Sequence, residues 1–200
     1  MQEQISQSTK EKAQEIARRF GVEVMDDLRD KSNDEVFRFF GALVDTGLVV
    51  LHGTNAEERF DKLEARQAKD TTKKSGNKKA VYAQDGITIP LGLAILNRKY
   101  LKSKLKDASA GWTSVKEKTT FEFSPNIYEL YKSGDPNFFT DGYVYVLDKA
   151  NFINAPDAGP EWHSEVDQDP VLAYRVSKRL AEDIFRPDSV REYGPEELQK

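Results

Sequence analysis

Few side chains in this sequence are able to do chemistry. It holds two histidines, His52 and His163, and no cysteine, which excludes disulfides, thiolate metal sites and a cysteine nucleophile. No Gly-x-Ser-x-Gly pattern supports a serine triad. His163 and Glu165 have the spacing of a zinc signature, but that pattern is weak without cysteine partners. We therefore expect no metal centre and look for a site built from histidine, tyrosine and carboxylates.

Three short motifs combine such residues with strand-like surroundings. They are His-Gly-Thr at 52–54, Val-Tyr-Ala at 81–83 and Glu-Trp at 161–162. The first follows Leu-Val-Val-Leu at 48–51, a continuous apolar run that is typical of a strand buried on both faces. The sequence thus predicts chemistry-bearing residues at or near three separate strands.

In this order the motifs resemble the His-Tyr-Glu arrangement of the ADP-ribosyltransferase superfamily, in its poly(ADP-ribose) polymerase-like branch. In that family a first strand ends in His-Gly-Ser/Thr, a second contains a tyrosine before a helix, and a later strand supplies a glutamate. A further apolar strand carries another tyrosine, which is the place of Tyr174. The resemblance covers about residues 48–176 and leaves residues 1–47 outside it.

The resemblance implies an enzyme that uses NAD as its substrate, releases nicotinamide and transfers ADP-ribose to a protein or nucleic-acid acceptor. It implies that His52, Gly53, Thr54 and Tyr82 bind NAD. His52 would hydrogen-bond a ribose hydroxyl, and Tyr82 would stack on the nicotinamide ring. The backbone of Gly53 would hold the carboxamide, because a residue without Cβ allows that approach.

The resemblance also implies a catalytic carboxylate. Nicotinamide leaves through a transition state with oxocarbenium character, which a nearby negative charge stabilises. Glu161 is the preferred candidate because Trp162 follows it and Tyr174 lies downstream, and Glu165 remains a second candidate. In either case the carboxylate would bind the ribose 2′-hydroxyl and help to orient the acceptor.

Two other readings stay open. His-Gly-Thr is also similar to a motif of RNA 2′-phosphotransferases, which use NAD within the same fold and hold an RNA phosphate with basic residues. Arg59 and Arg66 are available for that role. The other reading is a non-catalytic nucleotide-binding or interaction module with the same fold. Residues 85–88 lack the serine-rich continuation of the polymerase branch, so we expect transfer of a single ADP-ribose unit.

Composition sets limits on partners and location. The chain has 200 residues, of which 38% are hydrophobic and 32% charged, with a net charge of −4. This acidic balance argues against a general nucleic-acid binder. No apolar run is long enough to span a bilayer, and the polar residues 1–4 do not form a secretory signal. We expect a cytoplasmic protein that does not bind membranes.

The first 47 residues predict two helices. Ser8 with Glu11, and Ser32 with Glu35, have capping-box spacing. After the second box, apolar residues recur at helical spacing up to Gly47. We expect residues 1–47 to form an N-terminal helical extension and residues 48–200 to form an ADP-ribosyltransferase-like domain.

Beyond Gly47 the pattern indicates many short strands interrupted by helices. Strands are expected near 48–51, 80–83, 119–123, 142–147, 162–166 and 171–176, and helices over 56–63, 90–105 and 177–185. The lysine-rich residues 69–79 are expected to form a loop. This order predicts an α+β fold with short strands in two packed sheets and peripheral helices, and neither a Rossmann glycine motif nor a P-loop is present.

Overall fold

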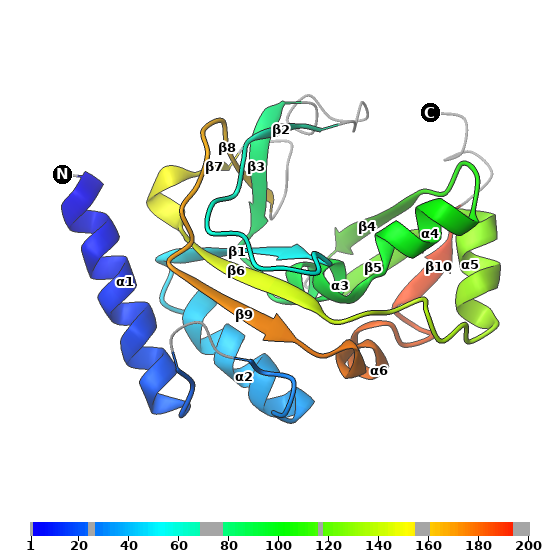
Figure 1. The fold of residues 1–200 in the computed structure, drawn as a ribbon, viewed down its shortest axis with the longest axis horizontal. Helices are drawn as coiled ribbons and strands as arrows, with labels where there is room; N and C mark the ends of the chain where they lie inside the picture. The colour runs from blue at the N-terminus through cyan, green and yellow to red at the C-terminus, as the bar shows by residue number, and fades with distance from the viewer. Residues whose placement is uncertain (1, 24–26, 69–77, 116–117, 155–160, 194–200) are drawn as a thin grey trace.

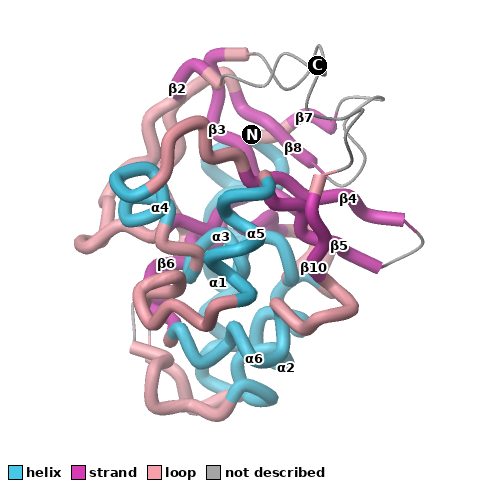
Figure 2. Tube along the Cα trace, turned by 90° about the vertical axis from the view of Figure 1, so that its right-hand side faces the viewer, coloured by secondary structure: helices cyan, strands magenta, loops and turns pink. Residues whose placement is uncertain are grey.

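The computed structural model describes residues 2–23, 27–68, 78–115, 118–154 and 161–193. Over these residues the protein has an α+β fold with two sheets, as the sequence predicts (Figures 1 and 2). The helices are α1 (Gln2–Arg19), α2 (Asn33–Val44), α3 (Thr88–Ile95), α4 (Arg98–Lys104), α5 (Pro125–Lys132) and α6 (Ala181–Ile184). The strands are β1 (Val49–Thr54), β2 (Arg66–Gln67), β3 (Lys79–Gln84), β4 (Ala110–Val115), β5 (Lys118–Phe123), β6 (Gly142–Asp148), β7 (Ile153–Asn154), β8 (Glu161–Ser164), β9 (Leu172–Val176) and β10 (Val190–Glu192).

The larger sheet has the strand order β7-β8-β3-β1-β6-β9, with β2 paired to β3. Strand β1 pairs with β6 along its whole length, but it pairs with β3 at a single position, Leu51 with Gln84. Figure 1 shows β3 and β8 rising away from the plane of β1, β6 and β9. The sheet therefore consists of a β1–β6–β9 half and a β3–β8 half that separate beyond Leu51.

The two faces of the β1–β6–β9 half have different neighbours. On one face, Leu51, Val144 and Tyr174 join the main hydrophobic cluster together with α1, α2 and α3. We call this the helix face. On the other, Val50 and Tyr145 belong to a second cluster, which is covered in part by side chains of the segment after β1. His52 is two residues beyond Val50 and shares its face, because side chains alternate along a strand; we call it the His52 face.

The N-terminal helices pack into the same core as the sheet. The capping box predicted for α2 is present: the Ser32 side chain accepts from the backbone of Glu35, whose carboxylate accepts from the backbone of Ser32. Phe39 of α2 is fully buried, with its ring centroid 5.0 Å from that of Tyr174 in an edge-on contact. Gly47 follows α2 with φ +69°, a left-handed conformation that suits glycine.

The smaller sheet has the order β10-β5-β4. Strand β10 comes from the far end of the described chain and pairs in parallel with β5. The buried carboxylate of Glu122 accepts a hydrogen bond from Thr113 Oγ1 at 2.9 Å and is also bound by the guanidinium of Arg191. One carboxylate thereby links all three strands.

Most of the predicted strands are confirmed, and three helix predictions need correction. Helix α1 begins at Gln2, so Ser8 lies within the helix and does not cap its start. Residues 56–63 form no helix. The Phe60 N–H donates to the Tyr145 hydroxyl at 2.7 Å, and Leu63 exchanges backbone hydrogen bonds with Gln168. These long-range bonds hold the segment in an irregular path against the sheet, where local helix signals have no influence.

The helix predicted over 90–105 is two helices, α3 and α4. Leu96 is extended with ψ 116° and forms an isolated bridge with Phe139. Asn97 then caps α4, since its side chain accepts from the Tyr100 N–H. The sequence contains this signal, because asparagine is a preferred N-cap residue. Strands β2, β4, β7 and β10 and helix α5 were not predicted. Residues 69–77 of the predicted lysine-rich loop lie outside the described residues.

Candidate functional site

His52 lies near the end of β1, where β1 and β3 separate. It is half-buried, and its Nδ1 lies 2.7 Å from the backbone oxygen of Tyr82. A carbonyl oxygen accepts hydrogen bonds and cannot donate one, so Nδ1 carries the proton. In the neutral ring, Nε2 is then an acceptor.

Burial, and to a lesser degree nearby positive charges, keeps the His52 ring neutral. Burial lowers the pKa of His52, and the positive charges of Arg98 and Arg66 lower it further, against the opposing effect of the hydrogen bond to Tyr82. His52 is therefore uncharged at neutral pH. Such a ring suits acceptance of a hydrogen bond from a hydroxyl group better than pairing with an anion.

Gly53 is a glycine because helix α3 lies against it. A Cβ added there would approach the Pro90 backbone oxygen to 1.8 Å and the Ala94 backbone nitrogen to 3.0 Å. Gly142 on β6 meets the same helix, with the Ala94 oxygen 1.9 Å from an added Cβ. Packing against α3 thus accounts for Gly53, whether or not its backbone also binds a ligand.

Tyr82 belongs to a polar cluster on the β3–β8 half. It lies opposite His163 on the paired strand, with the ring centroids 6.3 Å apart. Lys78 Nζ lies 3.1 Å from Nε2 of the buried His163 and 2.6 Å from Oε1 of Glu165. The hydrogen bond and charge of Lys78 lower the pKa of Glu165. Glu165, the second carboxylate candidate, is thus an exposed ion-pair partner of Lys78.

Glu161 is the first residue of β8 and is half-buried. Its Cα partner across the ladder is Gln84, which in turn pairs with Leu51 of β1. Paired residues point to the same face of a sheet. Glu161 and Tyr82 therefore lie on the side continuous with the helix face, whereas His52 points to the other.

The structure thus brings the predicted residues onto neighbouring strands without gathering all their side chains. His52 contacts Tyr82 through the Tyr82 backbone. Tyr174, the tyrosine expected downstream, is fully buried in the main core against α2. Thr54 is half-buried on the His52 face, opposite Tyr143 of β6.

Sequence reasoning missed several charged residues near the site. Trp162 Nε1 donates to Asp85 Oδ2 at 2.9 Å, and Lys149 Nζ lies 4.2 Å from the Trp162 ring centroid. On the His52 face, Arg175 of β9 lies over the ring of Tyr143 at 5.9 Å. An arginine at 175 within the apolar run of β9 was a signal in the sequence that a charged group faces away from the core.

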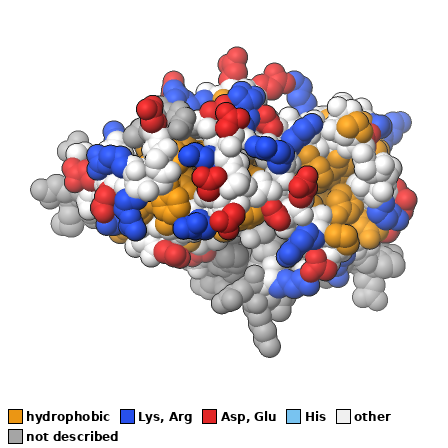
Figure 3. Space-filling view, turned by 90° about the horizontal axis from the view of Figure 1, so that it is seen from below, with side chains coloured by type: hydrophobic (Ala, Val, Ile, Leu, Met, Phe, Trp, Pro, Cys, Tyr) orange, Lys and Arg blue, Asp and Glu red, His pale blue; other side chains and the backbone are white. Residues whose placement is uncertain are grey.

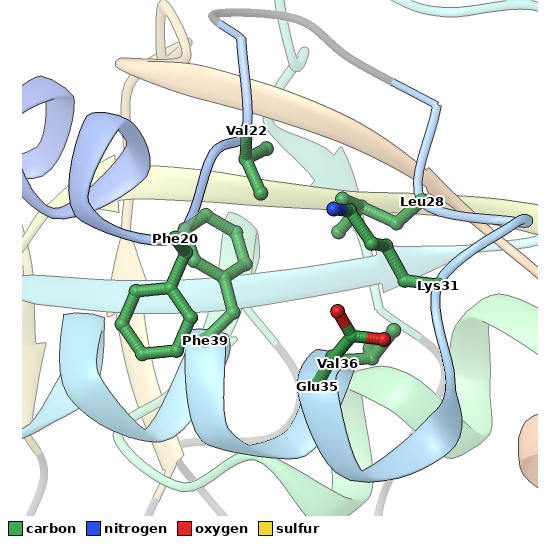
Figure 4. Close-up of a pocket in the computed structure, with 7 residues that line it drawn as sticks. All are labelled: Phe20, Val22, Leu28, Lys31, Glu35, Val36 and Phe39. Atoms are coloured by element: carbon green, nitrogen blue, oxygen red, sulfur yellow. The ribbon is translucent and has the colours of Figure 1, made fainter.

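Two surface hollows lie away from these residues. One, with about 240 Å³ of empty space, lies between α2 and the segment that connects α1 to α2, and is lined mainly by apolar side chains such as Phe20 and Phe39 (Figure 4). Figure 3 shows the underside of the molecule as drawn in Figure 1, with hydrophobic patches between charged groups and no visible histidine. The other hollow lies beside Phe60 and Ala173. Neither is lined by His52, Tyr82 or Glu161.

Within the described ranges, no group of three or more histidine, aspartate or glutamate side chains is arranged to hold a metal ion. Over the same part of the chain, no helix has the length and apolar character needed to cross a bilayer. Comparison of the chain with family models, curated proteins and solved structures found no match. The resemblance of the three motifs to ADP-ribosyltransferases therefore remains a prediction.

Proposed function

We propose that this protein is an NAD-dependent mono-ADP-ribosyltransferase-like enzyme that transfers ADP-ribose to a protein or nucleic-acid acceptor. The observation that carries the proposal is the state of His52. Its Nδ1 is fixed by the Tyr82 carbonyl, and Nε2 is an acceptor at the point where β1 and β3 separate. A ribose hydroxyl is a suitable donor to such a nitrogen.

NAD is proposed to bind where β1 leaves β3. Over His52–Thr54, one edge of β1 is paired with β6, whereas the ladder to β3 has ended at Leu51. The Gly53 backbone on the β3 side is proposed to hold the nicotinamide carboxamide. A ligand at this edge lies between the two faces of the sheet, so His52 on one side and Glu161 on the other are both candidates to contact it.

In this proposal Glu161 supplies the negative charge that stabilises the developing ribose cation. The alternative carboxylate, Glu165, follows the last residue of β8 and is paired with Lys78. An ion pair to lysine reduces the ability of a carboxylate to stabilise another cation. Glu161 is half-buried whereas Glu165 is exposed, and we therefore assign the catalytic role to Glu161.

The test is incubation of the purified protein with NAD labelled in both its nicotinamide and its adenosine parts. Released nicotinamide and label on protein or RNA are measured separately. For Glu161→Gln we expect transfer to fall by about a hundredfold or more, with NAD binding retained. Glu165→Gln tests the competing carboxylate, and Glu129→Gln, on the exposed side of α5, is the matched control. Full activity of Glu161→Gln would remove this residue from the reaction.

A second candidate function is a non-catalytic nucleotide-binding module. The observation in its favour is that Glu161 and His52 point to opposite faces, and Glu165 is already paired. The discriminating measurement is the melting temperature with and without NAD, since a ligand that binds the folded state alone raises it. A rise in melting temperature without nicotinamide release would favour this candidate over the enzyme.

A further inference from the structure

Gln84, the last residue of β3, is a buried polar residue. It is 4% exposed, and among the described residues nothing donates a hydrogen bond to its side-chain oxygen, Oε1. A buried amide oxygen without a donor destabilises a fold, because it loses the hydrogen bonds that it makes with water in the unfolded chain. Folding alone therefore does not account for a glutamine at this position.

The pairing register places Gln84 in the middle of a row of three residues. It pairs with Leu51 of β1 on one side and with Glu161 of β8 on the other. Paired residues point to the same face, so this row lies on the side that is continuous with the helix face. Gln84 therefore lies between the point where β1 leaves β3 and the carboxylate to which we assign the catalytic role.

The next row on β3 and β8 points to the same face. It consists of Tyr82 and His163, which are paired across the two strands. Val81 and Ala83 point to the opposite face and belong to the second hydrophobic cluster. The helix-side face of the β3–β8 half is therefore polar, whereas the same face of the β1–β6–β9 half is apolar.

Gln84 is adjacent to each group that is proposed to hold the nicotinamide end of NAD. Tyr82, the residue proposed to stack on the ring, lies two positions earlier on the same face of β3. Gly53 lies two residues beyond Leu51 on β1, and diagonal neighbours across paired strands are within reach of a long side chain. Glu161 lies directly opposite on β8.

The oxygen of Gln84 suits a primary amide as its partner. A primary amide has two N–H donors, so a carboxamide that gives one of them to the Gly53 carbonyl has a second one to give. The last torsion of a glutamine is broad, which allows Oε1 to turn toward the half-buried Glu161. A carboxylate at the same place would offer no donor, and its charge would face the Gln84 oxygen and the carboxylate of Glu161.

We propose that Gln84 determines the specificity of the proposed NAD site by accepting a hydrogen bond from the carboxamide of the nicotinamide ring. It thereby selects NAD against nicotinic acid adenine dinucleotide, which differs from NAD in carrying a carboxylate in place of this amide. The inference rests on the proposed function in taking the ligand to be NAD. It deepens that function by assigning the choice between amide and acid to one side chain.

The experiment measures binding of the two dinucleotides by calorimetry, with wild type and Gln84→Met. We expect wild type to bind NAD about tenfold or more tightly than the acid analogue. Gln84→Met should bind NAD about tenfold more weakly than wild type, because one hydrogen bond is lost, and the acid analogue with unchanged affinity. Gln67→Met, the same substitution at an exposed position of β2, is the matched control and should discriminate as wild type does.

The melting temperature without ligand tests the premise separately. Gln84→Met should melt at or above the temperature of wild type, because the substitution removes a buried oxygen that has no donor. Gln84→Leu carries both tests if the methionine variant does not fold. A lower melting temperature in both variants would show that the Gln84 amide stabilises the fold by itself, and it would overturn the inference.

Equal affinity of wild type for the two dinucleotides would also overturn the inference, as would binding of neither one to the folded protein or undiminished discrimination in Gln84→Met. The outcome for the proposed function is read from nicotinamide release by the wild type. Release with discrimination that does not depend on Gln84 would leave the enzyme proposal standing and remove this role. A Gln84-dependent preference for NAD without release would support the role and contradict the enzyme proposal.

Discussion

The two histidines lie on the same sheet, yet their surroundings differ in charge. His163, on the β3–β8 half, lies 3.1 Å from Lys78, and Lys78 is paired with Glu165 at 2.6 Å. His52, on the β1–β6–β9 half, bonds a neutral carbonyl, and the charges that act on it are both positive.

This difference distinguishes the structural network around His163 from the surroundings of His52, which are a candidate ligand site. Around His163, the cation and the carboxylate satisfy one another, so folding alone explains their presence. Around His52, Arg66 is paired with Glu64, whereas the half-buried Arg98 forms no ion pair among the described residues. A histidine whose pKa is lowered, next to a half-buried arginine without an ion-pair partner, is therefore the better indication of where a ligand binds.

The largest effect is expected from a change that displaces the strand carrying His52. Gly53→Ala places a Cβ 1.8 Å from the Pro90 backbone oxygen, which cannot move as a side chain can. We expect the free energy of unfolding to fall by about 3 kcal/mol or more, measured by urea denaturation. Gly41→Ala is the control, since an added Cβ meets nothing within 4 Å there and alanine favours the helix. Equal stability of the two variants would contradict the close packing of β1 on α3.

A smaller change in the free energy of unfolding is expected from the titration of His52. Because the pKa of His52 is lowered in the folded state, the unfolded chain takes up a proton first as the pH falls. The stabilisation is complete above about pH 6.5 and is lost as the pH falls towards the folded-state pKa. His52→Gln retains a donor for the Tyr82 carbonyl but has no titrating group. Urea unfolding at about pH 7.5 and about pH 5.5 should therefore show a larger loss for wild type than for His52→Gln. A loss of the same size in both proteins would mean that burial and the arginines do not act on His52.

The smallest effect on stability is expected from a change in the network of Lys78, His163 and Glu165. Lys78→Met removes the hydrogen bond and the charge that lower the pKa of Glu165, so that pKa should return to its ordinary range. Stability at neutral pH should change little, because the side chains of Lys78 and Glu165 are 41% and 59% exposed to solvent. The measurement is an NMR titration of the glutamate carboxyl groups, with Lys79→Met as the neighbouring control. An unchanged Glu165 titration in Lys78→Met would show that the pair does not form in solution.

Local patterns predicted much of the fold. The capping box of Ser32 and Glu35, the apolar run ending at Leu51 and the alternation before Val176 are confirmed as α2, β1 and β9. The errors occur where distant residues determine the path. Residues 56–63 follow bonds to Tyr145 and Gln168, which no local pattern reveals.

The candidate site was predictable to a lesser degree. The motifs at 52–54, 81–83 and 161–162 fall on β1, β3 and β8, which are neighbours in the sheet. The face of the sheet to which each side chain points depends on the register in which the strands pair. No local sequence pattern predicts this register. The positions of Arg98 near His52 and of Arg175 over the Tyr143 ring are properties of the folded arrangement and of no single segment.

The parallel pairing of β10 with β5 has a consequence for the order of folding. Arg191 and Glu122 are 69 positions apart. The smaller sheet is therefore completed late, after the intervening strands of the larger sheet have been synthesised. During synthesis, Glu122 has no cationic partner from β10 until that strand has emerged from the ribosome. Contacts between such distant residues close slowly, and the last step of assembly is therefore expected to be the docking of β10. A chain interrupted before Val190 would keep its larger sheet but leave one edge of β5 open to pairing with another molecule.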